Sequence, residues 1–155
     1  MKLFKVPLIL FVIVGFQGKA DDIESRITDQ FSDISSGVEL ILKKTSPNET
    51  LLVFDIDNTI LRTRTDFGSE HWFLWQKQLI ESGVTGLPSV AKNISDLLTV
   101  QGWIYQVGRM IPVSKEIPTF IRDLRDRGVR VIALTSRVLG ARDSTLKELA
   151  LNQIE

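Results

Sequence analysis

Residues 51–60 read LLVFDIDNTI, and this stretch decides the fold. Its first four residues form an unbroken apolar run, which is typical of a strand buried on both faces of a parallel sheet. Two carboxylates, Asp55 and Asp57, follow at once, and Thr59 stands two residues later. A buried strand that ends in acidic side chains predicts an α/β fold in which the carboxyl edge of the sheet carries the polar groups.

A second strand of this kind is predicted at 129–134, after an apolar helical stripe at 117–124 that ends at Gly128. We expect the two strands to be parallel and buried on both faces. Three polar residues follow the second strand: Thr135, Ser136 and Arg137. Because ligands of open parallel sheets bind beyond the carboxyl ends of the strands, both polar groups are expected to face one pocket.

Helices are predicted at both ends of the mature chain. Apolar residues recur at steps of three and four from 23 to 41, which indicates one face of an amphipathic helix. A last helix is expected over 142–155. Its inward residues would be Leu146, Leu149, Ala150 and Ile154.

The segment between the two strands has a different character. It carries an aromatic-rich helix at 70–81 and a weaker helix at 89–101, with a turn-rich break between them. We therefore divide the mature chain, 21–155, into an α/β domain and a helical insert at about 62–112.

Residues 1–20 are predicted to be a secretory signal peptide. The first five residues carry two lysines and no acid, an apolar run extends to Phe16, and small residues precede a cut after Ala20. The alternative, an uncleaved membrane anchor, requires about 18 or more apolar residues, and this run is shorter. We expect an exported protein, periplasmic or secreted, with no stable membrane anchor after cleavage.

Composition excludes several classes of protein. The chain of 155 residues is 43% hydrophobic and 25% charged, which is an ordinary globular mixture. Removal of Lys2, Lys5 and Lys19 with the signal peptide leaves 16 of the 19 basic residues against 19 acidic ones, a net charge of −3. Such a charge offers no basic surface to a nucleic acid, so no nucleic-acid partner is expected. The chain has no cysteine, so its stability must come without disulfides.

The segment FDIDNT resembles the first motif of the haloacid dehalogenase-like (HAD) superfamily, Asp-x-Asp-x-Thr after a buried strand. VIALTSR, residues 131–137, is similar to the second motif, in which Thr or Ser ends the next strand. Within that superfamily, the sequence from Leu51 onward most resembles an uncharacterised secreted bacterial family. The resemblance implies a Rossmann-like parallel sheet of HAD type with a helical cap as the insert.

The same resemblance implies a Mg²⁺-dependent phosphate-ester hydrolase acting on a small phosphorylated substrate. Asp55 would attack phosphorus to form an aspartyl-phosphate, and Asp57, oriented by Thr59, would exchange protons with the leaving oxygen and with water. Mg²⁺ would bind the carboxylate of Asp55 and the backbone carbonyl of Asp57. The substrate-binding residues would be Thr59, Thr135, Ser136 and Arg137.

These residues also have purely structural interpretations. Two acids one residue apart are common in turns and helix caps, and Thr135 with Ser136 is compatible with a plain helix cap. Arg137 would pair either with a substrate phosphate or with a nearby carboxylate. The only histidine, His71, and the aromatic residues beside it are expected mainly in packing.

The superfamily pattern continues with a lysine and with acids on a later strand, and neither Lys115 nor Lys147 stands at the place of that lysine. By the resemblance, the chain is the N-terminal part of such an enzyme, truncated after the second-motif strand and inactive by itself. The alternative is a non-catalytic exported remnant or binding protein that retains part of the fold. Either way, the strand at 129–134 or its neighbour is expected to be an uncovered edge that favours self-association.

Overall fold

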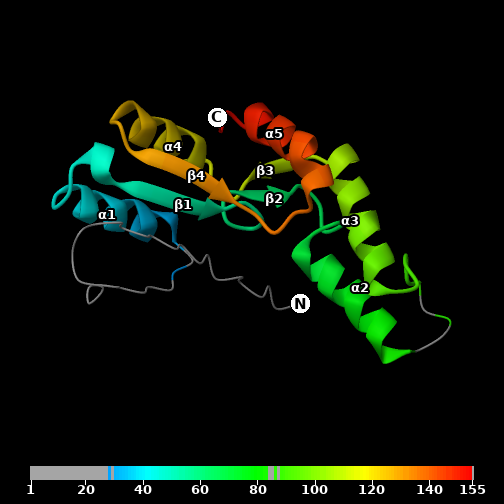
Figure 1. Cartoon of the computed structure of the whole chain (residues 1–155). Coiled ribbons are helices and arrows are strands. Elements are labelled where there is room, and N and C mark those ends of the chain that lie inside the picture. The colour runs from blue at the N-terminus through cyan, green and yellow to red at the C-terminus, as the bar shows by residue number, and fades with distance from the viewer. Residues whose placement is uncertain (1–27, 29, 84–85, 87, 155) are drawn as a thin grey trace. The chain divides into compact units, whose positions relative to one another are not determined.

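The computed structural model describes residue 28, residues 30–83, residue 86 and residues 88–154 (Figure 1). The predicted signal peptide and the predicted helical residues before Thr28 lie outside these described residues. The fold is mixed α/β, as the sequence predicts. In chain order the elements are α1 (Phe31–Leu42), η1 (Pro47–Glu49), β1 (Leu51–Asp55), β2 (Leu61–Thr63), α2 (Glu70–Ser82), α3 (Ile94–Val107), β3 (Met110–Pro112), α4 (Ile117–Asp126), β4 (Arg130–Leu134), η2 (Leu139–Ala141) and α5 (Arg142–Leu151).

The described chain forms two compact units. The first, which we call the strand unit, comprises Leu61 and the described residues before it, Pro112–Thr135 and Ile154. It contains α1, η1, β1, α4 and β4. β1 and β4 therefore belong to one unit together with the helix that precedes each of them.

The second, which we call the helical unit, comprises Arg62–Ile111 and Ser136–Gln153 and contains α2, α3, η2 and α5. Its first segment has nearly the bounds of the insert predicted at 62–112. Its second segment falls within the α/β domain of that prediction. The short strands β2 and β3, which the sequence does not indicate, form a two-stranded sheet.

β1 and β4 are parallel neighbours, with Leu51 opposite Arg130 and Asp55 opposite Leu134. This register confirms the prediction that the two apolar strands pair in parallel. The sheet they form has two strands among the described residues. The finer prediction, a Rossmann-like sheet of HAD type, is not confirmed.

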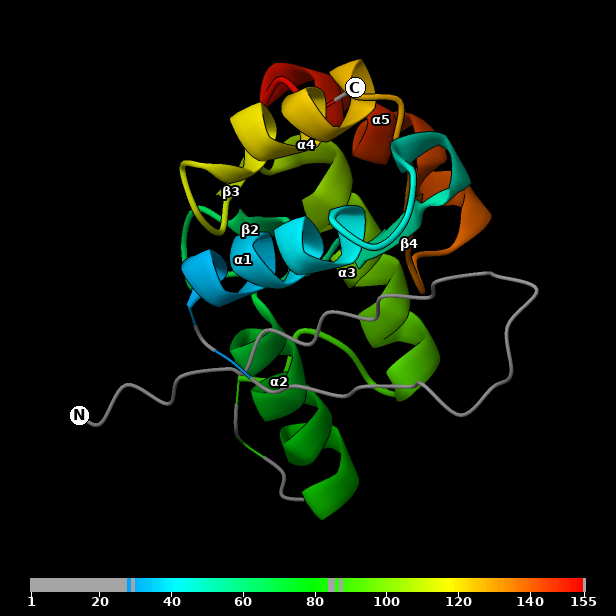
Figure 2. The same ribbon diagram turned by 90° about the vertical axis from the view of Figure 1, so that its left-hand side faces the viewer.

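One face of this sheet is covered by α1 and α4, which lie side by side (Figure 2). Phe31 of α1 meets Phe120 of α4 edge to face, with ring centroids 5.2 Å apart. Leu52 and Phe54 of β1 are buried. The helices contribute the buried residues Ile34, Val38, Ile117, Ile121 and Leu124 to this core. All five belong to the helical stripes expected from the sequence, so that prediction is confirmed.

The prediction that β4 is buried on both faces is wrong. Ile132 is 47% exposed and Leu134 is 64% exposed. Both residues lie opposite β1 residues that alternate with Leu52 and Phe54, so they belong to the face that α1 and α4 do not cover. Among the described residues, β4 also has no strand on its outer edge. An apolar run shows that a strand is suited to burial, but a neighbouring element must be present to bury it.

α2 confirms the helix predicted at 70–81. α3 confirms that the insert has a second helix, but it begins five residues and ends six residues later than the predicted 89–101. α2 begins after Ser69, whose hydroxyl accepts a hydrogen bond from the Trp72 N–H at 3.2 Å. α3 begins after Asn93, whose side chain accepts from the Asp96 N–H at 2.9 Å. Both caps satisfy backbone donors at the first turn, which explains why the helices start where they do.

Two glutamines are buried inside the helical unit. Gln76 of α2 donates to the Pro88 carbonyl at 3.4 Å and accepts from the Val90 N–H at 2.9 Å. Gln101 of α3 donates to the Gly68 carbonyl at 2.8 Å. These bonds give the buried amide side chains hydrogen-bond partners and hold a loop against each helix.

α5 turns a different face inward from the one predicted. Leu146 is 48% exposed and Ala150 is exposed, whereas Thr145 and Glu148 are buried. Ile154, which follows the helix, is buried as expected. The apolar pattern of α5 therefore does not identify its inner face.

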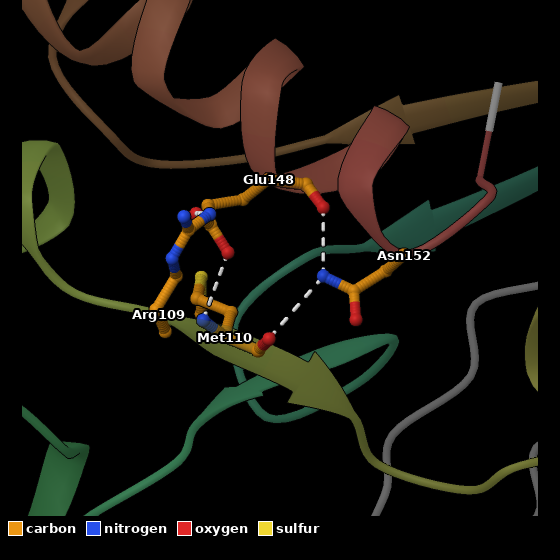
Figure 3. Close-up of polar contacts among 4 residues, drawn as sticks. All are labelled: Arg109, Met110, Glu148 and Asn152. Carbon is orange, nitrogen blue, oxygen red and sulfur yellow. Dashed lines mark hydrogen bonds and ion pairs between the residues drawn. The ribbon is translucent and has the colours of Figure 1, made fainter.

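The buried carboxylate of Glu148 explains this orientation (Figure 3). Its Oε2 accepts from the Met110 N–H of β3 at 2.9 Å, and its Oε1 lies 3.5 Å from the Arg109 guanidinium. Asn152 donates to the Met110 carbonyl at 3.3 Å. Side chains of and just after α5 thus satisfy both backbone polar groups of Met110, as a neighbouring strand would.

Candidate functional site

The candidate site begins where β1 ends, at Asp55. The backbone then makes a tight turn in which the Ile56 carbonyl accepts from the N–H groups of Thr59, Ile60 and Leu61 at 3.4, 3.1 and 3.0 Å. Asn58 has a φ of 60°, a left-handed conformation that asparagine tolerates better than most residues. Local turn chemistry therefore sets the position of the acidic residues.

Buried side chains anchor this turn. Ile56, Ile60 and Leu61 are each at most 2% exposed. By contrast, Asp55 is exposed and Asp57 is half-buried. The turn is thus fixed by its apolar residues while both carboxylates remain within reach of a ligand.

Thr59 contacts Asp55. Its hydroxyl, on a side chain that is largely buried, donates to Asp55 Oδ2 at 3.2 Å. The superfamily resemblance implies Asp57 as the partner of this threonine, so the observed partner differs from the expected one. The hydrogen bond fixes the orientation of the Asp55 carboxylate.

Thr135 comes directly after the β4 residue that pairs with Asp55. Asp55 is opposite Leu134, and Thr135 is the next residue along the chain. The structure therefore brings the carboxyl ends of β1 and β4 together, so the backbone of Thr135 follows directly on the strand neighbour of Asp55. Asp57 belongs to the same unit, in the turn after β1.

Ser136 and Arg137 belong to the helical unit. Within that unit the Arg137 guanidinium lies 3.9 Å from the centre of the Tyr105 ring and donates to the Thr145 hydroxyl at 2.9 Å. It also lies 3.0 Å from the Met110 sulfur. These contacts give Arg137 a packing role inside the helical unit, and its predicted contact with phosphate stays a prediction.

An open hollow lies beside the turn in the strand unit. The Val113 N–H donates to the Ile60 carbonyl at 3.2 Å, which holds the loop before α4 against the turn. Asn58 and Lys115 both line the hollow, together with the first residues of α1 and α4. The Ser114 hydroxyl donates to the Glu116 carboxylate and thereby lowers the pKa of that carboxyl group. Sequence reasoning does not place Lys115 here, because only the fold brings its loop to the turn.

Asp55 and Asp57 are the residues available to a divalent cation at this site. Among the described residues there is no group of three or more His, Cys, Asp or Glu side chains placed to hold a metal ion. Mg²⁺ is nevertheless commonly bound by one or two carboxylates, with water and substrate phosphate completing its ligands. The two aspartates fit that mode of binding and not an all-protein metal cage.

No helix within the described part of the chain is long and apolar enough to cross a membrane.

Comparison with curated proteins and with solved structures finds no match. A protein-family model matches residues 27–155. The assignment to the HAD superfamily is wrong, because the family that matches is a different one. The two motifs behind that assignment are short, and a buried strand that ends in Asp-x-Asp-x-Thr specifies a local turn without specifying a family. The chain belongs to the family described as Protein of unknown function (DUF2608).

Proposed function

We propose that the chain is a Mg²⁺-dependent phosphate-ester hydrolase that works through an aspartyl-phosphate on Asp55. The expectation that the chain is inactive by itself rested on the superfamily resemblance, which the family match overturns. The observation that carries the proposal is the register of β1 and β4, which sets Thr135 just beyond the neighbour of Asp55. A carboxylate nucleophile and a hydroxyl that binds a phosphoryl oxygen must reach the same phosphoryl group, and the carboxyl ends of neighbouring parallel strands are where open sheets bind ligands. The substrate would be a small phosphorylated molecule, and the protein would act in the periplasm or outside the cell.

In the first step, an Asp55 oxygen attacks phosphorus and the bond from phosphorus to the ester oxygen breaks. Asp57 acts as the general acid and gives a proton to that leaving oxygen. In the second step, water attacks the phosphorus of the aspartyl-phosphate and the bond to Asp55 breaks. Asp57 takes the proton from that water, and inorganic phosphate is released.

The other residues position these groups. The Thr59 hydroxyl holds Asp55 Oδ2, which orients the carboxylate for attack. In this proposal Thr135, which belongs to the same unit as Asp55, binds a phosphoryl oxygen. Mg²⁺, bound by the Asp55 carboxylate and the Asp57 carbonyl, would neutralise charge on the phosphoryl oxygens.

The test uses the full chain with Mg²⁺ and p-nitrophenyl phosphate. Nitrophenolate release measures turnover, and intact-protein mass measures a trapped phosphoryl group. Asp55→Asn should abolish both signals, because an amide is not an anionic nucleophile. Asp57→Asn should lower turnover by about 10²- to 10⁴-fold and should increase the trapped phosphoryl group, because no carboxylate then activates water. Asp126→Asn, an exposed acid at the end of α4, is the matched control and should change neither signal.

Two results would overturn the proposal. One is phosphate release that persists in Asp55→Asn. The other is the absence of both turnover and a phosphoryl adduct in the unmodified chain. If that chain nevertheless bound orthophosphate with Mg²⁺, it would be the non-catalytic binding protein that is the alternative reading of the sequence.

A further inference from the structure

The outer edge of β4 carries backbone groups in a defined order. The Arg130 N–H donates to the Thr50 carbonyl at 3.1 Å, so Arg130 turns its polar backbone groups toward β1. In a parallel pair this direction alternates along the strand. Ile132 and Leu134 therefore also face β1, and the N–H and C=O groups of Val131 and Ala133 face outward.

Among the described residues no strand lies on this edge, and β4 has few of the features that usually protect an edge strand. The strand reads RVIAL, with no proline, no lysine and no glycine. Its one charge, Arg130, stands at the first position. Ile132 and Leu134 are exposed on the uncovered face of the sheet. A strand of this kind is a template for pairing with another strand.

The outward groups favour one register for pairing with an identical strand. In an antiparallel pair, two residues that face each other exchange two hydrogen bonds when both turn their backbone groups inward. If Val131 lies opposite Ala133 of a second copy, both outward residues of each strand are paired. A register centred on Val131 or on Ala133 pairs only one of the two. The favoured register sets Ile132 opposite Ile132 and Arg130 opposite Leu134.

We propose that β4 pairs antiparallel with β4 of a second copy of the chain, and that Arg130 of each copy lies over Asp55 of the other. Opposite residues of neighbouring strands project from the same face of a sheet. Arg130 of the second copy lies opposite Leu134 of the first, and Leu134 lies opposite Asp55 in its own chain, so all three side chains share a face. Two strand spacings separate Arg130 from Asp55, about 10 Å between backbones. An extended arginine and an aspartate together span that distance across Leu134.

Charge and symmetry both favour a second copy as the occupant. The positive guanidinium of Arg130 approaches the negative carboxylate of Asp55 in the other copy. Two-fold symmetry makes this contact twice in each dimer. The exposed Ile132 side chains cover each other at the centre. The pairing does not depend on the proposed hydrolase. A role for Arg130 in neutralising the charge of a phosphoryl group on Asp55 does rest on the proposed hydrolase.

Cross-linking tests the register. Because the chain has no cysteine, Ile132→Cys introduces its only thiol. Residues opposite each other at a non-hydrogen-bonded position have Cα atoms about 4.5 Å apart, which lies within the range of a disulfide. Mild oxidation of the full-length variant should give a covalent dimer. Arg130→Cys is the matched control in the same strand, because its copies lie about 13 Å apart in this register and should not cross-link. A mixture of Arg130→Cys with Leu134→Cys should cross-link.

Sedimentation tests the pairing and the Arg130 contact without cysteine. Ala133→Pro removes an outward N–H that the dimer needs, and prolines are tolerated at such edge positions, so this variant should be folded and monomeric. Arg130→Glu should raise the dimer Kd by about tenfold through repulsion from Asp55. Adding Asp55→Asn to Arg130→Glu should restore part of that loss.

The outcomes separate the two proposals. An unmodified chain that sediments as a monomer, with no cross-link in Ile132→Cys, would overturn the pairing. Equal cross-linking of Ile132→Cys and Arg130→Cys would overturn the register. Additive effects of Arg130→Glu and Asp55→Asn would overturn the contact between them. Failure to detect a phosphoryl group on Asp55 would contradict the proposed hydrolase, but it would not change the expected cross-linking of β4.

Discussion

Glu148 shows how one buried side chain supports a backbone segment. Its carboxylate accepts from the Met110 N–H, and removing that acceptor leaves a buried donor unpaired. Glu148→Ala should therefore lower the free energy of unfolding by about 1–3 kcal/mol. Glu148→Gln retains an acceptor oxygen and should cost less. Urea denaturation of both variants measures the difference, and equal losses would show that the hydrogen bond to Met110 contributes nothing.

Glu39 and Arg127 form an ion pair between α1 and the end of α4. Arg127 Nη1 lies 2.5 Å from Glu39 Oε1, and Nη2 lies 3.2 Å from Oε2. The hydrogen bond from Arg127 lowers the pKa of Glu39 below its ordinary value of 4.5. A carboxyl with a lowered folded-state pKa contributes stability above its unfolded pKa and loses it as the pH falls through the folded value.

Glu39→Gln should therefore lower stability at pH 7 by about 0.2–1 kcal/mol, a small amount because both side chains are partly exposed. At a pH below the folded pKa of Glu39 the variant and the unmodified chain should be equally stable. Thermal unfolding across that range measures the convergence. A stability difference that stays constant with pH would contradict the ion-pair explanation.

At the scale of elements, Gly68 shows why α3 packs closely on the loop before α2. Its φ is +77°, and a Cβ added there would lie 2.4 Å from Ile104 Cγ2. Gly68→Ala should destabilise the protein by about 1–3 kcal/mol, through both the strained backbone and the overlap. Gly37, inside α1, has open space around it, so Gly37→Ala should instead stabilise by about 0.5–1 kcal/mol. Chemical denaturation of the two variants should give shifts of opposite sign.

At the scale of the whole molecule, the predicted signal peptide determines the residue at which the mature protein should begin. The run from Val6 to Phe16 is too short to be a stable anchor, and Ala20 precedes the acidic pair that opens the mature chain. Expression in a bacterial host should therefore yield exported protein that begins at Asp21. Intact mass of the exported fraction measures this directly. Recovery of a chain that begins at Met1 in the membrane fraction would contradict cleavage.

The sequence by itself determined the α/β class, the first strand and the helices α2 and α4. Their signals are local: an apolar run, apolar residues at helical spacing, and polar groups where an element ends. It also determined that the two acids stand at the carboxyl end of the strand, where Asp55 is the last residue of β1 and Asp57 comes just after it. Parallel pairing followed as well, because two strands separated by helices are joined by a crossover connection.

Only the tertiary structure decided what covers each element. β4 has the composition of a buried strand, yet Ile132 and Leu134 are exposed because α1 and α4 share the opposite face. α5 turns Glu148 inward because Met110 needs a backbone partner there. Thr59 contacts Asp55 because the backbone turns back after the end of β1. Periodicity records which side chains tolerate burial, whereas their actual partners are set by residues far away in the chain.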